Sequence, residues 1–188
     1  MFTGIIEEKA KISKISMDRL QKISIQSGLE VKKGDSIAIQ GICFTVTEIL
    51  KNGFSVEAMK QTKDITTLSG WHAGSYVNLE RPLEFGDRLG GHLLLGHIDE
   101  LGKLIRVKGN EHFLQIRPEN TKHLILKGSI GIDGVSLTIS SISKNIFSVS
   151  LIPYTLKNTT LGNLRLGSFV NIEYDYIAKI IIAKANSH

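Results

Sequence analysis

The amino-acid sequence contains the same segment twice, and this internal repeat constrains the fold more than any other feature. One copy runs over residues 36–45 and the other over residues 129–138, so that Gly134 lies 93 positions after its counterpart Gly41. The offset holds without a gap as far as Glu80, and roughly twenty of about forty-five positions are identical. A period of this length is a small domain rather than a solenoid unit. The sequence therefore predicts a tandem duplication.

The repeat divides the 188 residues into two units and a tail. A unit of about 90 residues buries only about 60–65% of the surface of its unfolded chain and is marginally stable alone. We therefore expect the units to pack against each other or against other chains. The predicted domains are residues 1–91 and 92–175, with a glycine-rich junction at 85–91 and a C-terminal helix at 176–188.

Composition and charge exclude several classes of protein. The net charge is +5, but the basic residues are scattered and are not interleaved with aromatic residues, so no nucleic-acid partner is expected. The single cysteine, Cys43, excludes an intrachain disulfide and zinc sites built from cysteine pairs. No apolar run reaches the roughly 18–20 residues of a membrane span, and the first residues lack the regions of a signal peptide. A cytoplasmic protein without a membrane contact is expected.

Short strands are predicted throughout, which indicates an all-β fold class. After the turn at Gly41, apolar Ile42 and Phe44 alternate with the small residues Cys43 and Thr45, the pattern of a strand with one apolar and one polar face. Six strands are predicted in the first half, at 11–15, 21–26, 36–40, 42–47, 53–59 and 75–79. Six more follow at 99–107, 113–117, 129–133, 135–142, 147–152 and 168–174. Six short strands per half favour a closed or nearly closed antiparallel barrel.

Helices are predicted to be few and short. Residues 28–33 and 121–126 form one predicted pair, and residues 62–68 and 155–161 form another. The tail at 175–185 has no counterpart in the first half, and Ile177, Ile180 and Ile181 fall on one helical face after a candidate N-cap, Asp175. A helix of about three turns is too short to be stable alone. We therefore expect it to dock on its own barrels or on a helix of another chain.

Two groups of residues are candidates for chemistry. Cys43 and Ser136 occupy equivalent positions, each followed two residues later by a threonine on the same strand face, and this pattern fits function and close packing equally well. His97 is a candidate acid–base group, although a satisfied surface histidine has the same pattern. His92 and His97 are five residues apart and lie on opposite faces of a strand, so no metal site is predicted. The nearby glycines do not match a phosphate-binding loop.

Four segments of the sequence resemble the riboflavin synthases of the alpha type. They are residues 1–8, residues 41–47, residues 90–98 and residues 127–138, and they occur in the same order as in that family. The resemblance covers essentially the whole chain. One departure is that Leu94 and Leu95 stand where the family usually has small or polar residues, and another is a short C-terminal tail.

The resemblance implies a fold, a reaction and an assembly. The fold would be two homologous six-stranded antiparallel Greek-key barrels in tandem with a short C-terminal α-helix, assembled as a homotrimer. The reaction would be the dismutation of two 6,7-dimethyl-8-ribityllumazine molecules to riboflavin and 5-amino-6-(ribitylamino)uracil, with no cofactor. Two copies of one substrate need two similar pockets, and holding them face to face makes their reaction effectively intramolecular. Lumazine synthase is a further candidate partner.

The resemblance also implies two sets of site residues. The first pocket would use Gly4, Ile5, Ile6, Cys43, Phe44, Thr45, Glu57, Ala58, Met59, Lys60, Gln61 and Thr62. The second would use Gly96, His97, Ile98, Lys127, Ser136, Leu137, Thr138, Ile152, Pro153, Tyr154, Thr155, Leu156 and Lys157. His97 is the candidate for proton transfer, with Ser136, Cys43 and Asp175 as assisting groups. Ser36 matches a further position of the site.

Two rival functions have to be compared with this one. A lumazine protein, which is a non-catalytic relative, binds the same ligand as a fluorescent antenna but tends to lose motif residues in one half. Here both halves keep their motifs, which favours the enzyme. A flavin-reductase-like electron carrier would need a nicotinamide domain, for which this chain has no room.

Overall fold

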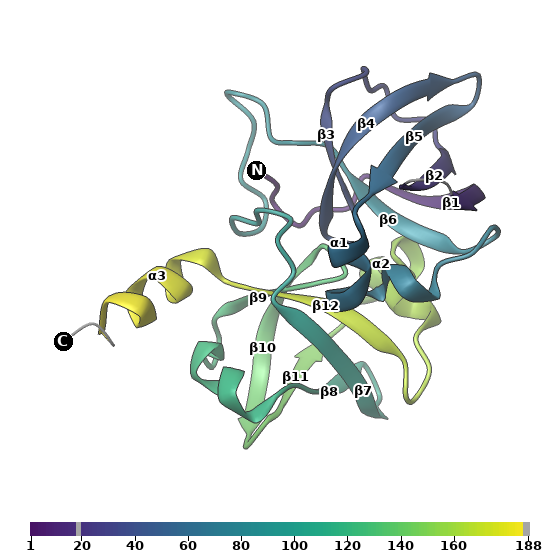
Figure 1. The fold of residues 1–188 in the computed structure, drawn as a ribbon. Helices are drawn as coiled ribbons and strands as arrows, with labels where there is room; N and C mark the ends of the chain where they lie inside the picture. Colours follow the sequence, from purple (N-terminus) through teal and green to yellow (C-terminus); the bar gives the residue numbers. More distant parts are fainter. Residues whose placement is uncertain (18–19, 186–188) are drawn as a thin grey trace.

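A computed structural model, which describes residues 1–17 and 20–185, contains two closed six-stranded antiparallel barrels (Figure 1). The strands of the first are β1 (Glu8–Met17), β2 (Gln21–Gln26), β3 (Ser36–Ile39), β4 (Ile42–Leu50), β5 (Gly53–Ala58) and β6 (Tyr76–Glu80). Those of the second are β7 (Glu100–Lys108), β8 (Glu111–Gln115), β9 (Ser129–Ile132), β10 (Val135–Ser143), β11 (Ile146–Ser150) and β12 (Phe169–Tyr174). Both have the same strand order, β1-β2-β5-β4-β3-β6 and β7-β8-β11-β10-β9-β12. The predicted fold class and the duplication are confirmed.

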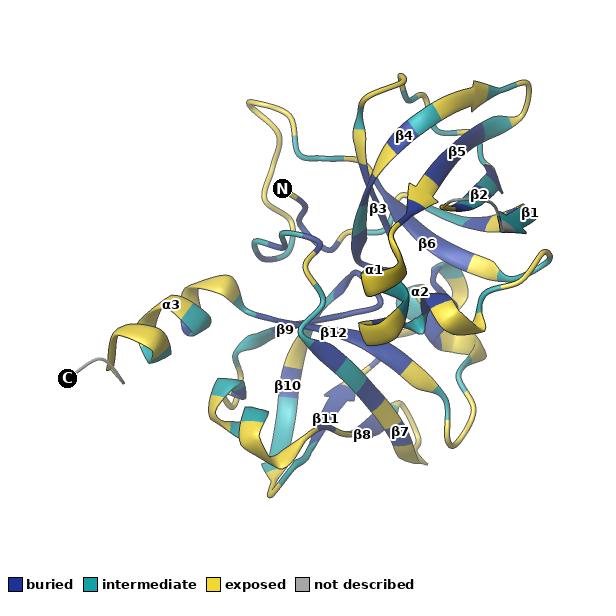
Figure 2. Cartoon of the chain, in the orientation of Figure 1, coloured by how far each residue is buried: buried dark blue, intermediate teal, exposed yellow. Residues whose placement is uncertain are grey.

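The interior of each barrel is filled by apolar side chains. In β4, Ile42, Phe44 and Val46 are at most 5% exposed and belong to the first core, whereas Cys43 is half-buried and Thr45 is exposed on the outer wall (Figure 2). Each buried side chain of this size contributes about 1.5–3 kcal/mol of transfer free energy. The barrels are therefore packed cores, and the predicted site residues of β4 lie outside them.

The two barrels meet at a pair of equivalent turns. Gly41 and Gly134 each occupy the second position of a two-residue hairpin loop, with φ of 76° and 80°, as type I′ turns require. A Cβ atom on Gly41 would lie 2.6 Å from the backbone nitrogen of Gly134, so only glycine permits this approach. Phe2 and Leu94, which are far apart in the sequence, also form a two-way backbone bridge, with N···O distances of 2.8 and 3.0 Å.

A buried hydrogen-bond network fixes how the barrels are oriented. The side-chain amide of Asn78 in β6 donates to the Asp133 carbonyl, and that of Asn171 in β12 donates to the Gln40 carbonyl, both at 2.9 Å. In return, the backbone N–H groups of Thr160 and Thr67 donate to the side-chain oxygens of Asn78 and Asn171 at 2.8 Å. Because buried polar groups are costly unless they are paired, this symmetric set favours a single arrangement of the two barrels.

The helices are short and stand outside the barrels. They are α1 (Lys60–Ile65), α2 (Pro153–Asn158) and α3 (Tyr176–Ala185), with 3₁₀ turns η1 (Thr67–Gly70), η2 (Pro118–His123) and η3 (Thr160–Asn163). The predicted pair at 62–68 and 155–161 is confirmed. The pair at 28–33 and 121–126 is not: the second becomes η2, which begins earlier at a proline, and the first is not helical.

Residues 28–33 form neither a helix nor a strand, because contacts with residues elsewhere in the chain decide their path. The Glu8 carboxylate accepts hydrogen bonds from the Ser27 hydroxyl at 2.7 Å and from the Gly28 N–H at 3.1 Å. Leu29 and Val31, two residues apart, both pack against the first core. Side chains at that spacing share a face only in an extended chain, so the core overrides the local preference.

Helix α3 projects away from both barrels (Figure 1). The predicted N-cap is confirmed, because Asp175 Oδ1 accepts a hydrogen bond of 2.8 Å from the Ile177 N–H. An ion pair of 2.9 Å between Lys179 and Asp99 ties the first turns to the second barrel. The apolar side chains Ile177, Ile180 and Ile181 are 45–63% exposed. None of the described helices is long and apolar enough to cross a membrane.

Candidate substrate-binding site

The structure contains two equivalent polar positions, each facing a glycine. Cys43 on β4 faces Gly96, and Ser136 on β10 faces Gly4, with glycine φ angles of 79° and 78°. A Cβ atom on either glycine would lie 2.5 Å from the Cβ atom of the facing residue. The Cys43 and Ser136 N–H groups each donate to the facing glycine carbonyl at 2.9 Å. Both the angle and the close approach therefore require glycine at the two positions.

The structure regroups the predicted site residues. The segment 4–6 comes from the first half but lies on the second barrel, where Ile6 packs against the second core. The segment 96–98 lies on the first barrel, where Ile98 packs against the first core. The sequence-based grouping of 4–6 with Cys43 and of 96–98 with Ser136 is therefore wrong. The reason is the crossing of the two segments at the Phe2–Leu94 bridge, which a linear motif does not reveal.

The surroundings of Ser136 include a histidine that the sequence analysis did not place in the site. A hydrogen bond of 2.6 Å joins His92 Nδ1 to Ser136 Oγ. His92 is only 8% exposed, and its Nε2 atom has no hydrogen-bond partner among the described residues. Burial lowers the pKa of His92, and the nearby Asp175 opposes this shift. The imidazole is therefore neutral near neutral pH, when it can accept a proton from Ser136 or from a water molecule.

Gly91, which precedes this histidine in the motif, also packs closely against Ser136. A Cβ atom on Gly91 would lie 2.1 Å from the Thr3 carbonyl oxygen and 2.7 Å from the Ser136 Cβ atom. The pair Gly91-His92 therefore packs directly on the second pocket. Of the predicted catalytic residues, Ser136 and Asp175 interact with His92. Cys43 lies against Gly96 and is hydrogen-bonded to Ser36.

The pocket around Cys43 has different chemistry. Burial raises the pKa of the Cys43 thiol, while a hydrogen bond with Ser36 opposes the shift. A thiol with a raised pKa is mostly protonated near neutral pH and is a weak nucleophile, so Cys43 is suited to contact a ligand rather than to attack it. His97 follows Gly96 directly and is exposed to solvent in this chain.

Most residues of the predicted segments 57–62 and 152–157 lie on short helices at the surface, whereas Ala58 is buried in the first core. Helix α1 and helix α2, which contain much of the segments 57–62 and 152–157, have no buried side chain, and Met59 and Tyr154 are 70% and 71% exposed. Lys127 has a φ of 65°, which is strained for a residue with a side chain. Its N–H donates to the Ile139 carbonyl of β10 at 3.0 Å. The equivalent residue in the first barrel is a glycine, Gly34, which bonds to Val46 in the same way at 2.8 Å.

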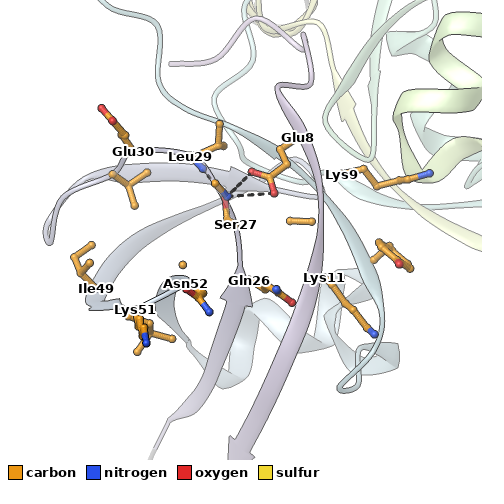
Figure 3. A pocket seen from close by; sticks show the side chains of 16 residues that line it. Glu8, Lys9, Lys11, Gln26, Ser27, Leu29, Glu30, Ile49, Lys51 and Asn52 are labelled. Carbon is orange, nitrogen blue, oxygen red and sulfur yellow. Dashed lines mark hydrogen bonds between the residues drawn. The ribbon is translucent and has the colours of Figure 1, made fainter.

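Two cavities of the single chain are lined by neither Cys43 nor Ser136. One cavity of about 730 Å³ lies beside β1, β2 and the β4–β5 hairpin and is lined by charged residues such as Glu8, Lys11 and Lys51 (Figure 3). None of the predicted site residues lines it. A second cavity of about 510 Å³ lies between the segment at Thr3 and Ile5 and the linker at 81–90. Only its Ile5 edge belongs to the predicted site.

Comparison with known proteins identifies the family. The lumazine binding domain family matches residues 3–82 and again residues 95–175. The riboflavin synthase of Bacillus subtilis (strain 168) is 41% identical over 199 residues, which cover 100% of this chain and 93% of that protein. The riboflavin synthase of Escherichia coli (strain K12) is 41% identical over 189 residues, which cover 93% of this chain and 87% of that protein.

Solved structures agree with this relationship. LumP complexed with 6,7-dimethyl-8-(1'-D-ribityl) lumazine has a TM-score of 0.81 and 29% identity, covering 93% of this chain and 99% of that chain. LumP complexed with riboflavin has a TM-score of 0.83 and 32% identity with the same coverage. The two matched repeats, the two equivalent glycine-facing positions and the identity over nearly the whole chain lead to one conclusion. The chain belongs to the riboflavin synthase family, enzymes of riboflavin biosynthesis that contain two lumazine binding domains.

Proposed function

We propose that the chain catalyses the dismutation of two 6,7-dimethyl-8-ribityllumazine molecules. One molecule donates a four-carbon unit to the other, and the products, riboflavin and 5-amino-6-(ribitylamino)uracil, together contain all the atoms of the two substrates. No oxidant, reductant or cofactor is needed for this balance. The observation that carries the proposal is the duplicated position at which Cys43 faces Gly96 and Ser136 faces Gly4, with the same 2.5 Å approach. A reaction between two identical molecules needs two nearly equivalent binding sites.

The two pockets of one reaction come from different chains of a homotrimer. Thr45 and Thr138 stand on outer barrel walls and are exposed, as is His97. Helix α3 leaves its apolar face uncovered, which a short helix cannot sustain without a partner. Pairing the Cys43 pocket of one chain with the Ser136 pocket of its neighbour would bury these surfaces and hold the two substrates together. Such an arrangement makes the bimolecular step effectively intramolecular.

The residues of the two pockets would divide the proton transfers. One lumazine has to lose a proton from its 7-methyl group, and the exposed imidazole of His97 is suited to assist that step. The other lumazine has to accept a nucleophile or water. The Ser136–His92 pair is suited to supply the nucleophile, because the neutral His92 imidazole takes up the proton that the Ser136 hydroxyl or the water releases. Asp175 lies close enough to influence the charge of His92.

The experiment is incubation of the purified chain with 6,7-dimethyl-8-ribityllumazine alone. The expected result is the appearance of riboflavin fluorescence, with one riboflavin formed for every two lumazine molecules consumed. Binding of the lumazine without turnover would contradict the proposal and favour the non-catalytic antenna function. A requirement for a nicotinamide or another redox partner would also contradict it.

A further inference from the structure

Two buried carboxylates hold the glycine segments that face the pockets. Glu80, the last residue of β6, accepts hydrogen bonds from the N–H groups of Thr3 and Gly4 at 2.6 and 3.0 Å. Glu173 in β12 is the equivalent residue, and it accepts from the N–H groups of Leu95 and Gly96 at 2.7 and 3.1 Å. The side chains are 4% and 2% exposed. Each carboxylate therefore fixes one pocket segment by two adjacent backbone donors.

The two clamps differ by one hydroxyl group. The Thr3 hydroxyl donates a further hydrogen bond of 2.8 Å to Glu80. The equivalent residue on the other side is Leu95, which has no hydroxyl to donate to Glu173. A hydrogen bond to a charged group contributes about 1.5–3 kcal/mol, so the ionised form of Glu173 is the less well supported of the two.

The surroundings of Glu173 have a mixed effect on its charge. Burial is the largest influence and raises the pKa of Glu173 to about 7, while the Leu95 and Gly96 N–H groups lower it. Lys179 on α3 also lowers the pKa, and Asp99 before β7 raises it. The half-buried Cys43 thiol on β4 is the other titratable group that interacts with Glu173. The clamp can therefore change its protonation near neutral pH.

We infer that Glu173 is a positioning residue for the Cys43 pocket, and that only its ionised carboxylate holds the Leu95–Gly96 backbone in place for binding. A protonated carboxyl group has one good acceptor oxygen, so one of the two N–H bonds is lost. The Gly96 segment then loosens from β4, and with it the adjacent His97. The activity readout of this inference rests on the proposed function, whereas the structural readout does not.

The structural readout is a pH titration of backbone amide resonances in the intact protein between pH 5.5 and 8.5. The Gly96 amide should titrate with a midpoint near pH 7, because burial raises the pKa of Glu173 to about 7. Leu95→Thr restores the hydroxyl donor and should lower that midpoint by about one pH unit, because one unit corresponds to 1.36 kcal/mol. Glu173→Gln should abolish the titration. The matched variant Thr3→Val removes the donor on the other side and should raise the midpoint of the Gly4 amide.

The kinetic readout is the pH profile of riboflavin formation. The parent protein should lose activity below about pH 7, and Leu95→Thr should extend activity to lower pH. Glu173→Gln should be at least tenfold less active at pH 8. A Gly96 amide that does not titrate, or a Leu95→Thr variant whose midpoint is unchanged, would overturn the inference. A protein that is inactive at every pH would refute the proposed function, while the amide titration would still decide the role of Glu173.

Discussion

At the scale of single residues, the repeat is most informative where its two copies differ. Asp133 occupies the position of Gln40 in the buried network between the barrels and is 2% exposed. Burial raises the pKa of Asp133 from 3.8 to about 7. The Asn171 N–H, which donates to Asp133 Oδ1 at 2.8 Å, opposes the shift. In the first repeat the neutral side-chain amide of Gln40 accepts the equivalent hydrogen bond, from the Asn78 N–H. The carboxyl group of Asp133 therefore makes stability depend on pH and adds no hydrogen bond that an amide could not make.

The first prediction concerns Asp133→Asn. The folded protein binds the Asp133 proton more tightly than the unfolded chain does, so stability from this group is complete below about pH 4 and is lost as the pH rises to about 7. The loss is about 1.4 kcal/mol per pH unit within that window. The asparagine variant should therefore show a flatter dependence of the free energy of unfolding on pH, measured by urea denaturation at pH 5 and pH 7.5. Exposed Asp64→Asn is the control, and equal slopes in parent and Asp133→Asn would contradict the prediction.

The second prediction concerns the two histidines of the motif. His97→Gln should lower turnover by about 10²–10⁴, the usual effect of removing a positioned acid–base group, with little change in ligand binding. His92→Gln should lower turnover as well, and combining it with Ser136→Ala should add little, because the two residues act as a pair. Exposed His72→Gln is the control. A His97→Gln turnover within threefold of the parent would exclude His97 from proton transfer.

At the scale of secondary-structure elements, the sequence predicted what depends on local pattern. The alternation of Ile42, Phe44 and Val46 with small polar residues placed β4 and the outward direction of Cys43 correctly, because a strand has a strict period of two. Residues 28–33 were predicted incorrectly because distant contacts with Glu8 and the first core decide their path. The helix propensity of residues 28–33 cannot reveal contacts with residues that are distant in the sequence.

The same limit applies to the site. The motifs identified both glycine segments, but which barrel each one covers depends on the bridge between Phe2 and Leu94, whose partners are far apart in the chain. His92 was missed as a site residue because its partner, Ser136, lies 44 positions away. The domain boundaries at 91 and 175 remain predictions. Because segment 96–98 lies on the first barrel, the first 91 residues do not contain all the residues around Cys43.

The third prediction concerns helix α3. Replacing the exposed Ile177 and Ile181 by lysine should convert the proposed trimer to a monomer and remove activity with it, because the apolar face would no longer associate. The measurement is analytical ultracentrifugation alongside the riboflavin assay. Lys184→Ala, in the last turn of the same helix, is the control. A double-lysine variant that sediments as an unchanged trimer would show that α3 does not hold the assembly together.

At the scale of the whole molecule, the duplication gives each chain two different halves of a reaction site. The network around Asn78 and Asn171 holds the barrels of one chain in a symmetric arrangement. In the proposed homotrimer the exposed site walls would face neighbouring chains, so that a ring of three chains would contain three complete sites. This proposed interchain pairing is the central claim, and the exposure of Thr45, Thr138 and His97 in the single chain supports it.

Mixed assemblies of two inactive variants test that claim most directly. One variant has a disabled first pocket, Cys43→Phe with His97→Gln, and the other has a disabled second pocket, Ser136→Ala with His92→Gln. Each homotrimer should be nearly inactive. If the two variants mix at random in a head-to-tail ring, about a quarter of the interfaces in co-expressed trimers would join two intact pockets. Riboflavin formation should therefore return to about a quarter of the parent rate. Mixed trimers that are verified by native mass spectrometry and are as inactive as either variant would contradict the interchain site.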